Sequence, residues 1–213
     1  MPGSLTQTAR WPRPLEIAAR ALLATVLVLA VVQVLGRPLV RSLVPIFSTV
    51  VPLLDTRFAI TGVDLTRVGA NEVVRFRGNL SRPLLIRGRI VSPFGWNGVP
   101  AGGLQITYTV GGVLQYGAAL LIFVLAWPAE DSRDLARRLL VALPFIALLP
   151  ITIVPFTVVA EFSHGVESLP GASPTSGSLI ASRYLMGGGG WMIALVAAAF
   201  CIDHARRASS MTS

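Results

Sequence analysis

The sequence has no lysine, a single cysteine and few charged residues of either sign. Charged residues make up 13% of its 213 residues and hydrophobic residues 53%, whereas soluble domains carry roughly 25% charge. This balance argues against an ordinary soluble domain and, together with long apolar runs, predicts an integral membrane protein. Because Cys201 is alone, no disulfide can form within the chain.

Motifs that bind cofactors or metals are also missing. The chain has no paired cysteines, no serine elbow and no glycine-rich dinucleotide fingerprint, and Gly187–Gly190 lacks the Lys-Ser/Thr of a phosphate loop. The apolar segments contain essentially no ionisable side chains, which argues against an ion or proton transporter. We therefore expect no cofactor and no metal, and we expect the protein not to be an enzyme.

All eighteen basic residues are arginine, and the formal net charge is +8. The simplest explanation of this bias is a GC-rich genome. The functional alternative is that guanidinium groups are favoured for contacts with phosphate or carboxylate.

Four apolar segments predict transmembrane helices, at residues 17–36, 108–127, 139–160 and 185–202. The first follows a basic start, so a secretory signal peptide is an alternative. Arg37 and Pro38 follow Gly36 without a small-residue cleavage site, which favours an uncleaved anchor.

Prolines and glycines predict irregularities in the last two helices. The third segment contains Pro144, Pro150 and Pro155, so we expect a kinked helix. Gly187–Gly190 opens the fourth segment and allows either close helix contact or a bend.

The segment 37–107 does not continue the helical pattern. Its apolar stretch 43–54 is too short to span a membrane and contains Pro45 and Pro52, so we expect an interfacial segment and no continuous helix. Residues 57–107 alternate with a period of two and contain turn residues, which predicts a small antiparallel β-subdomain. Within it, Val73–Val91 resembles a hairpin with a long loop, because Pro83 cannot occupy a central ladder position.

The distribution of arginine predicts the orientation. The short segments 1–16, 128–138 and 203–213 are rich in arginine and are predicted to be cytoplasmic. Segments 37–107 and 161–184 are then extracytoplasmic, since long loops translocate largely regardless of charge. We expect a multi-pass protein of the bacterial inner membrane with both termini in the cytoplasm.

An arginine-rich ribbon lies in the predicted β-subdomain. Its members are Arg75, Arg77, Arg82, Arg87 and Arg89. Because the ribbon is predicted to be extracytoplasmic, nucleic acid is not expected as a partner. Three interpretations stay open: a solvated strand face beside lipid phosphates, a docking surface for an acidic or extended protein partner, and recognition of a phosphate-bearing lipid through arginine forks.

Two further clusters invite a catalytic interpretation. Glu161, His164 and Glu167 are three residues apart and could ligate a metal or transfer protons, but Gly165 and the loop after it make a continuous helix doubtful, and the alternative is the start of a polar loop. Cys201 and His204 could form a nucleophile and its base. The alternative is a buried or lipid-facing thiol at a helix exit.

Residues 20–200 resemble a known family in their layout and in three stretches: ITYTVGG, YGAALLIFVLAWP and DLARRLLVALP. The layout is an anchor helix, an extracytoplasmic β-segment and three further helices. It is similar to the small membrane proteins encoded beside bacterial exosortases, of the exosortase H-associated type. The resemblance implies an accessory component of an envelope protein-sorting system, with an exosortase as a partner. It does not imply the enzyme itself, which has more helices and a Cys, Arg and His site, and no functional residue is carried over.

The sequence therefore favours a non-enzymatic accessory or scaffold protein that contacts membrane lipids and docks a membrane protein. The alternative is an outer-leaflet lipid-handling protein or membrane enzyme. In that case the arginine ribbon would bind phosphate, and Glu161 and His164 would carry out acid–base chemistry.

Overall fold

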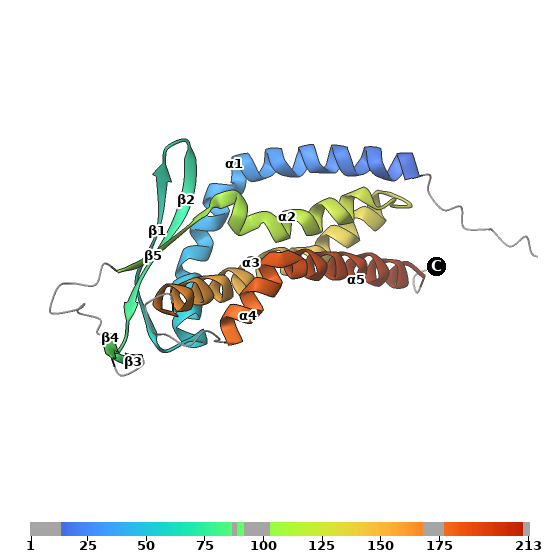
Figure 1. The fold of residues 1–213 in the computed structure, drawn as a ribbon. Helices are drawn as coiled ribbons and strands as arrows, with labels where there is room; N and C mark the ends of the chain where they lie inside the picture. The colour runs from blue at the N-terminus through green and yellow to red at the C-terminus, as the bar shows by residue number, and fades with distance from the viewer. Residues whose placement is uncertain (1–13, 87–88, 92–102, 168–176, 211–213) are drawn as a thin grey trace, which may run out of the picture.

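The computed structural model describes residues 14–86, 89–91, 103–167 and 177–210. Long helices lie side by side, with a small β-sheet at one end of them (Figure 1). In chain order the elements are α1 (Pro14–Leu54), β1 (Phe58–Val68), β2 (Asn71–Leu80), β3 (Leu84–Ile86), β4 (Arg89–Val91), β5 (Leu104–Thr109), α2 (Val110–Ala126), α3 (Ser132–Glu167), α4 (Gly177–Tyr184), the π-helical turn η2 (Leu185–Gly189) and α5 (Gly190–Ser210).

The described helices support membrane character. Three helical stretches are long and apolar enough to cross a membrane: Pro14–Leu54, Ser132–Gly165 and Ile180–Arg207. The second predicted span corresponds to α2, which is apolar but has 17 residues. The mainly helical fold, with a small antiparallel sheet between α1 and α2, agrees with the prediction.

The prediction that no continuous helix covers residues 43–54 was wrong, because α1 continues as a helix to Leu54. Pro38, Pro45 and Pro52 lie inside it at seven-residue intervals, which places them on one side of the helix. The opposite side is buried and contains Val40, Leu43, Phe47 and Val51. A proline ring pushes away the carbonyl four residues earlier, so a helix bends with its prolines on the outside. The bend of α1 toward the sheet follows from this pattern (Figure 1).

The sheet has the strand order β1-β2-β5 and is antiparallel throughout. The predicted single hairpin over Val73–Val91 was wrong. Strand β2 continues through Gly78 and Asn79 to Leu80 and pairs with β1 across a turn at Gly69, whose φ is +60°. Strands β3 and β4 form a separate two-stranded ladder. The long β1–β2 pairing is favoured because it places alternate β2 side chains on the helices.

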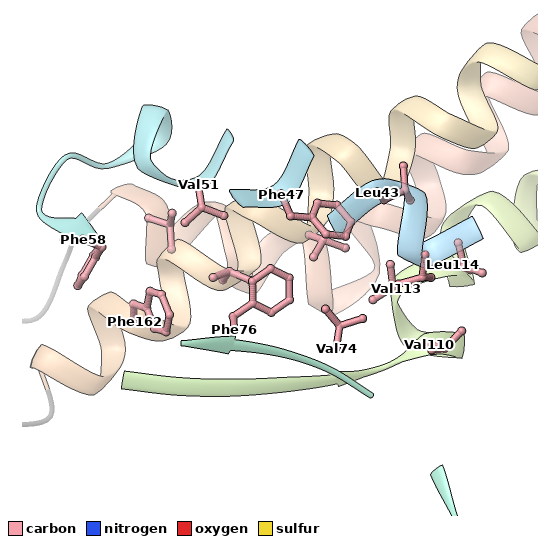
Figure 2. Packing of buried hydrophobic residues seen from close by; sticks show 14 of the residues in the cluster. Leu43, Phe47, Val51, Phe58, Val74, Phe76, Val110, Val113, Leu114 and Phe162 are labelled. Carbon is pink, nitrogen blue, oxygen red and sulfur yellow. The ribbon is translucent and has the colours of Figure 1, made fainter. Parts of the chain in front are cut away.

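A first hydrophobic cluster, the sheet cluster, joins the sheet to the helices (Figure 2). It contains side chains from the second half of α1, the strands, the start of α2 and the end of α3. Four phenylalanines are its largest members: Phe47, Phe58, Phe76 and Phe162. The Phe47 and Phe76 ring centroids are 5.8 Å apart, and those of Phe58 and Phe162 are 5.5 Å apart. The sheet is therefore packed firmly on the helical bundle.

A second cluster, the bundle cluster, joins α2, α3 and α5. It consists mainly of small side chains around Leu120 and Val124: Ala119, Ala142, Ala194, Ala197, Ala198 and Cys201. The glycines in η2 and at the start of α5 permit both a bend and a close helix contact, the two uses that the sequence suggested. Gly188 has a φ of +122° at the bend in η2, and a Cβ on Gly190 would lie 2.3 Å from the Tyr116 ring, so only glycine permits this contact.

Several predicted boundaries also change. The ITYTV stretch, whose last three residues were assigned to the second span, lies mostly in strand β5. Thr109 then caps α2 by accepting a hydrogen bond from the Gly112 N–H at 3.0 Å. The predicted loop 128–138 is helical from Ser132 onward. The predicted loop 161–184 contains the end of α3 and all of α4. Helix α3 passes through all three of its prolines without interruption.

Candidate functional site

The face of the sheet that points away from the helices is polar. Along β2, Val74 and Phe76 are buried on the helices, while Arg75 and Arg77 alternate with them and point to the other face. Thr107 of β5 lies opposite Arg75, and Gln105 lies opposite Arg77. Both β5 residues are exposed. We call this surface the outer face of the sheet.

The two arginines of the outer face differ in their contacts. The Arg77 guanidinium donates a hydrogen bond to the Asp64 carboxylate at 2.8 Å, and both side chains are substantially exposed. The Nε of Arg75 is buried and has no hydrogen-bond partner among the described residues. An unsatisfied donor on a cationic group is costly unless an acceptor reaches it. Because this Nε is buried, it does not itself meet a partner; Arg75 is half-buried and has no ion pair in the described part of the chain, which makes it a candidate on this face for contact with an acidic group.

The structure brings together a part of the predicted ribbon. Arg82 is exposed in the turn that follows β2. Arg89 belongs to β4, but its side chain lies outside the described part, as does the whole of Arg87. Of the five ribbon arginines, Arg75 and Arg77 are thus the two that the described structure places on one sheet face.

The second predicted cluster, around Glu161, sits on a helix and not at the start of a loop. Helix α3 runs through Gly165 to Glu167, so Glu161 and His164 lie on neighbouring positions of one helix surface. With Ser182 and Arg183 of α4 they line a depression of about 370 Å³. The described residues show no hydrogen bond between Glu161 and His164 and no cluster of three or more metal-ligating side chains. The Glu167 side chain lies outside the described part.

Cys201 and His204 are not arranged as a nucleophile and its base. Cys201 is fully buried in the bundle cluster. The exposed His204 ring stacks on Phe200, with the ring centroids 5.8 Å apart. This geometry agrees with the alternative interpretation, in which Cys201 is a buried thiol.

A polar anchor that the sequence did not reveal fixes the start of the sheet. Arg57 donates hydrogen bonds to both oxygens of Asp55, and its Nη2 also reaches the Ser163 hydroxyl of α3 at 3.2 Å. Burial acts to raise the pKa of Asp55, but the hydrogen bonds and charge of Arg57 outweigh it and lower that pKa below 3.8. The Asp-Thr-Arg sequence at a helix exit is a turn signal that could have suggested this contact.

A buried ion pair at the corner between α2 and α3 was also missed. Arg138 is completely buried, donates to the Asp134 carboxylate one helical turn earlier, and reaches the Trp127 carbonyl at 3.3 Å. The i,i+4 spacing of aspartate and arginine was the available signal, but a loop was expected there. This pair closes the turn and offers no open surface to a ligand.

Comparison of the chain with family models, with curated proteins and with solved structures gave no match in any of the three searches.

Proposed function

We propose that this protein is a non-enzymatic accessory or scaffold protein of a bacterial inner membrane, whose extracytoplasmic sheet docks a membrane-protein partner. The observation that carries the proposal is the two-sided sheet. Its inner face is fixed to the helices by the sheet cluster, and its outer face presents Arg75 and Arg77. A rigid polar platform that carries two arginines suits docking of a partner with acidic groups.

The proposed topology has four crossings. Near one end of α2, Val110 packs against Gly36 of α1, where an added Cβ would lie 3.0 Å from the valine. At the other end, Ala126 lines a groove together with Ala21 of α1. The two helices therefore match in length along residues 21–36 and 110–126. At 1.5 Å per residue, 17 residues reach about 26 Å, close to the ~30 Å hydrocarbon core.

The same arrangement supports the proposed orientation. The start of α1, the α2–α3 corner and the end of α5 lie at the end of the bundle opposite the sheet (Figure 1). These are the segments whose short flanks carry arginine, so the proposal puts them in the cytoplasm and the sheet in the periplasm. The proposed partner is an exosortase-type sorting protein, which rests on the resemblance of ITYTVGG and DLARRLLVALP.

The test is photo-cross-linking in native membranes with a photoreactive residue at Thr107, on the outer face. The expected result is one discrete protein adduct that is lost when Arg75 and Arg77 are both changed to glutamate. The matched control is the double change Arg206→Glu and Arg207→Glu at the opposite end of the bundle, which should leave the adduct intact. Adducts to lipid alone would contradict the proposal.

The depression beside α4 supports a second candidate, an outer-leaflet lipid-handling protein or membrane enzyme. Glu161, His164 and Arg183 line one hollow of about 370 Å³, and such a set could bind a phosphate and transfer a proton. Under this alternative Glu161→Gln and His164→Ala abolish function in a complementation assay, whereas reversal of Arg75 and Arg77 has little effect. The docking proposal expects the opposite pattern.

A further inference from the structure

A polar cavity of about 580 Å³ lies between α1 and the turn that joins β1 to β2, and it shares no lining residue with the two surfaces described above. Its walls come from three parts of the chain: the end of the apolar half of α1, the turn between β1 and β2, and the junction of β5 with α2. The lining residues that matter here are Gln33, Arg37, Arg67, Asn71, Glu72 and Gly111. The volume is in the range of roughly 300–1,000 Å³ typical of small-molecule sites.

The position of Arg37 places this cavity at the level of the lipid headgroups. No charged residue lies between Arg20 and Arg37. Along a helix this separation is about 26 Å, close to the ~30 Å thickness of the hydrocarbon core. Val34, at the edge of the cavity, and Leu35 beside it are exposed and would lie against acyl chains. The placement of Arg37 at the headgroups depends on the proposed membrane crossing of α1 and does not depend on any protein partner.

The charges in the cavity do not cancel. Arg37 forms an ion pair with Glu72 at 3.2 Å. Arg67 lies opposite Glu72 in the register of β1 and β2, but it forms no ion pair in the described part of the chain. Two guanidinium groups and one carboxylate leave a single positive charge, which matches the single negative charge of a phosphodiester. Guanidinium also offers paired donors in the geometry of phosphate oxygens.

We propose that this cavity binds the phosphodiester headgroup of a membrane phospholipid. Arg67 contacts the phosphate, because Arg37 is already engaged by Glu72. The side-chain amides of Gln33 and Asn71 supply further donors from the two sides of the cavity. The acyl chains run along the exposed apolar surface of α1. Bound in this way, a lipid bridges the membrane helix and the sheet.

The test uses the full-length protein in detergent micelles, titrated with short-chain phosphatidylglycerol and, separately, with inorganic phosphate. Arg67→Gln is expected to weaken lipid binding about tenfold, the loss expected for one charge-assisted hydrogen bond. The matched control is Arg82→Gln, which removes the same charge from an exposed arginine outside the cavity and should leave the affinity unchanged.

A second variant tests the cavity without changing its charge. A Cβ on Gly111 would meet no atom within 4 Å, so Gly111→Leu can be accommodated and should occupy the cavity, which lowers lipid affinity. The proposal is overturned if Arg67→Gln and Gly111→Leu bind lipid as wild type does, or if Arg82→Gln weakens binding equally. It is also overturned if inorganic phosphate binds as tightly as the lipid, since the site would then be one for free anions. The partner adduct at Thr107 should survive Arg67→Gln, so the failure of one proposal does not decide the other.

Discussion

The sheet cluster and the bundle cluster are both hydrophobic, but they are built from side chains of different size. The sheet cluster is filled by phenylalanine and valine, with Phe47, Phe58, Phe76 and Phe162 at its centre. The bundle cluster is lined by alanine, with Ala194, Ala197 and Ala198 all on α5. The first joins a sheet to helices, and the second joins helices to one another.

Under the proposed topology, the difference reflects two solvents. An extramembrane sheet is held by removing large apolar surfaces from water, about 25 cal/mol for each Å² buried. Between helices in lipid that driving force is absent, because acyl chains are as apolar as leucine, and close packing of small side chains replaces it. The sheet cluster should therefore be sensitive to lost volume and the bundle cluster to added volume. Four predictions follow, from the largest effect to the smallest.

Phe76→Ala should have the largest effect. Phe76 is completely buried on the central strand and contacts Phe47 of α1 and Tyr108 of β5. Its truncation should cost about 3–5 kcal/mol. Hydrogen exchange measured by mass spectrometry should show lost protection in β1, β2 and β5 while α5 stays protected. The same truncation at the exposed Phe156 of α3 is the control, and an equal loss there would refute the two-solvent interpretation.

Ala194→Leu should disrupt the bundle cluster instead. Ala194 is fully buried between helices, so a larger side chain must push them apart, at a cost of about 1–3 kcal/mol. We expect a lower thermal midpoint in lipid nanodiscs, with exchange increasing in α2 and α5 before the sheet. Ala199→Leu, the same change at an exposed position on α5, should be neutral. Tolerance of leucine at Ala194 would show that the bundle is loosely packed.

Thr109→Ala tests the joint between the two regions. The Thr109 hydroxyl caps α2 at the point where β5 becomes helix, and loss of such a cap costs about 1 kcal/mol. Exchange should rise in the first turn of α2, and Thr109→Ser should restore protection. Thr107→Ala, two residues earlier on the same strand, serves as the control. If both alanine variants behave alike, the cap does not stabilise the joint.

Tyr108→Phe should have the smallest effect at neutral pH. The Tyr108 hydroxyl is buried and forms no well-aligned hydrogen bond in the described part of the chain, although the Thr157 side chain is near enough to act on its pKa, so its removal should change stability by at most about 1 kcal/mol. Burial raises the pKa of Tyr108 from 10.0 to about 12.

The raised pKa gives this prediction a pH window. The Tyr108 hydroxyl holds its proton more tightly in the folded state than in the unfolded state. Its contribution to the free energy of unfolding is therefore fully present below pH 10 and is lost as pH rises toward 12. Denaturation measured across this window should show that loss in wild type and a smaller loss in Tyr108→Phe. Tyr184→Phe, at an exposed tyrosine, should keep the wild-type pH dependence. An unchanged profile in Tyr108→Phe would contradict the assignment.

Local patterns predicted the elements better than their ends. The period-two pattern located the sheet, and the apolar runs located all four main helices, because both signals depend on neighbouring residues. The ends were missed where packing overrides local preference. Residues 43–54 continue α1 despite Pro45 and Pro52, since Phe47 and Val51 are buried against the sheet. Helix α3 likewise continues through Gly165, and strand β2 continues through Gly78, although glycine locally favours the end of each element.

The candidate sites show the same limit. The sequence identified Arg75 and Arg77 as members of a basic ribbon, but it could not show that strand alternation places them on one face opposite Val74 and Phe76. It also gave no indication that α4 brings Arg183 beside Glu161. Such contacts join residues far apart in the chain, and no local pattern encodes them.

The sequence by itself determined the long apolar helices, the sheet between the first two helices and the arginine-rich composition, because hydropathy, periodicity and charge are properties of short segments. Tertiary structure alone decided what each apolar surface covers. The first half of α1 stays largely exposed, whereas one side of its second half is buried against the sheet. Both halves are apolar. The difference arises because α1 bends at its prolines and the sheet packs onto its second half only.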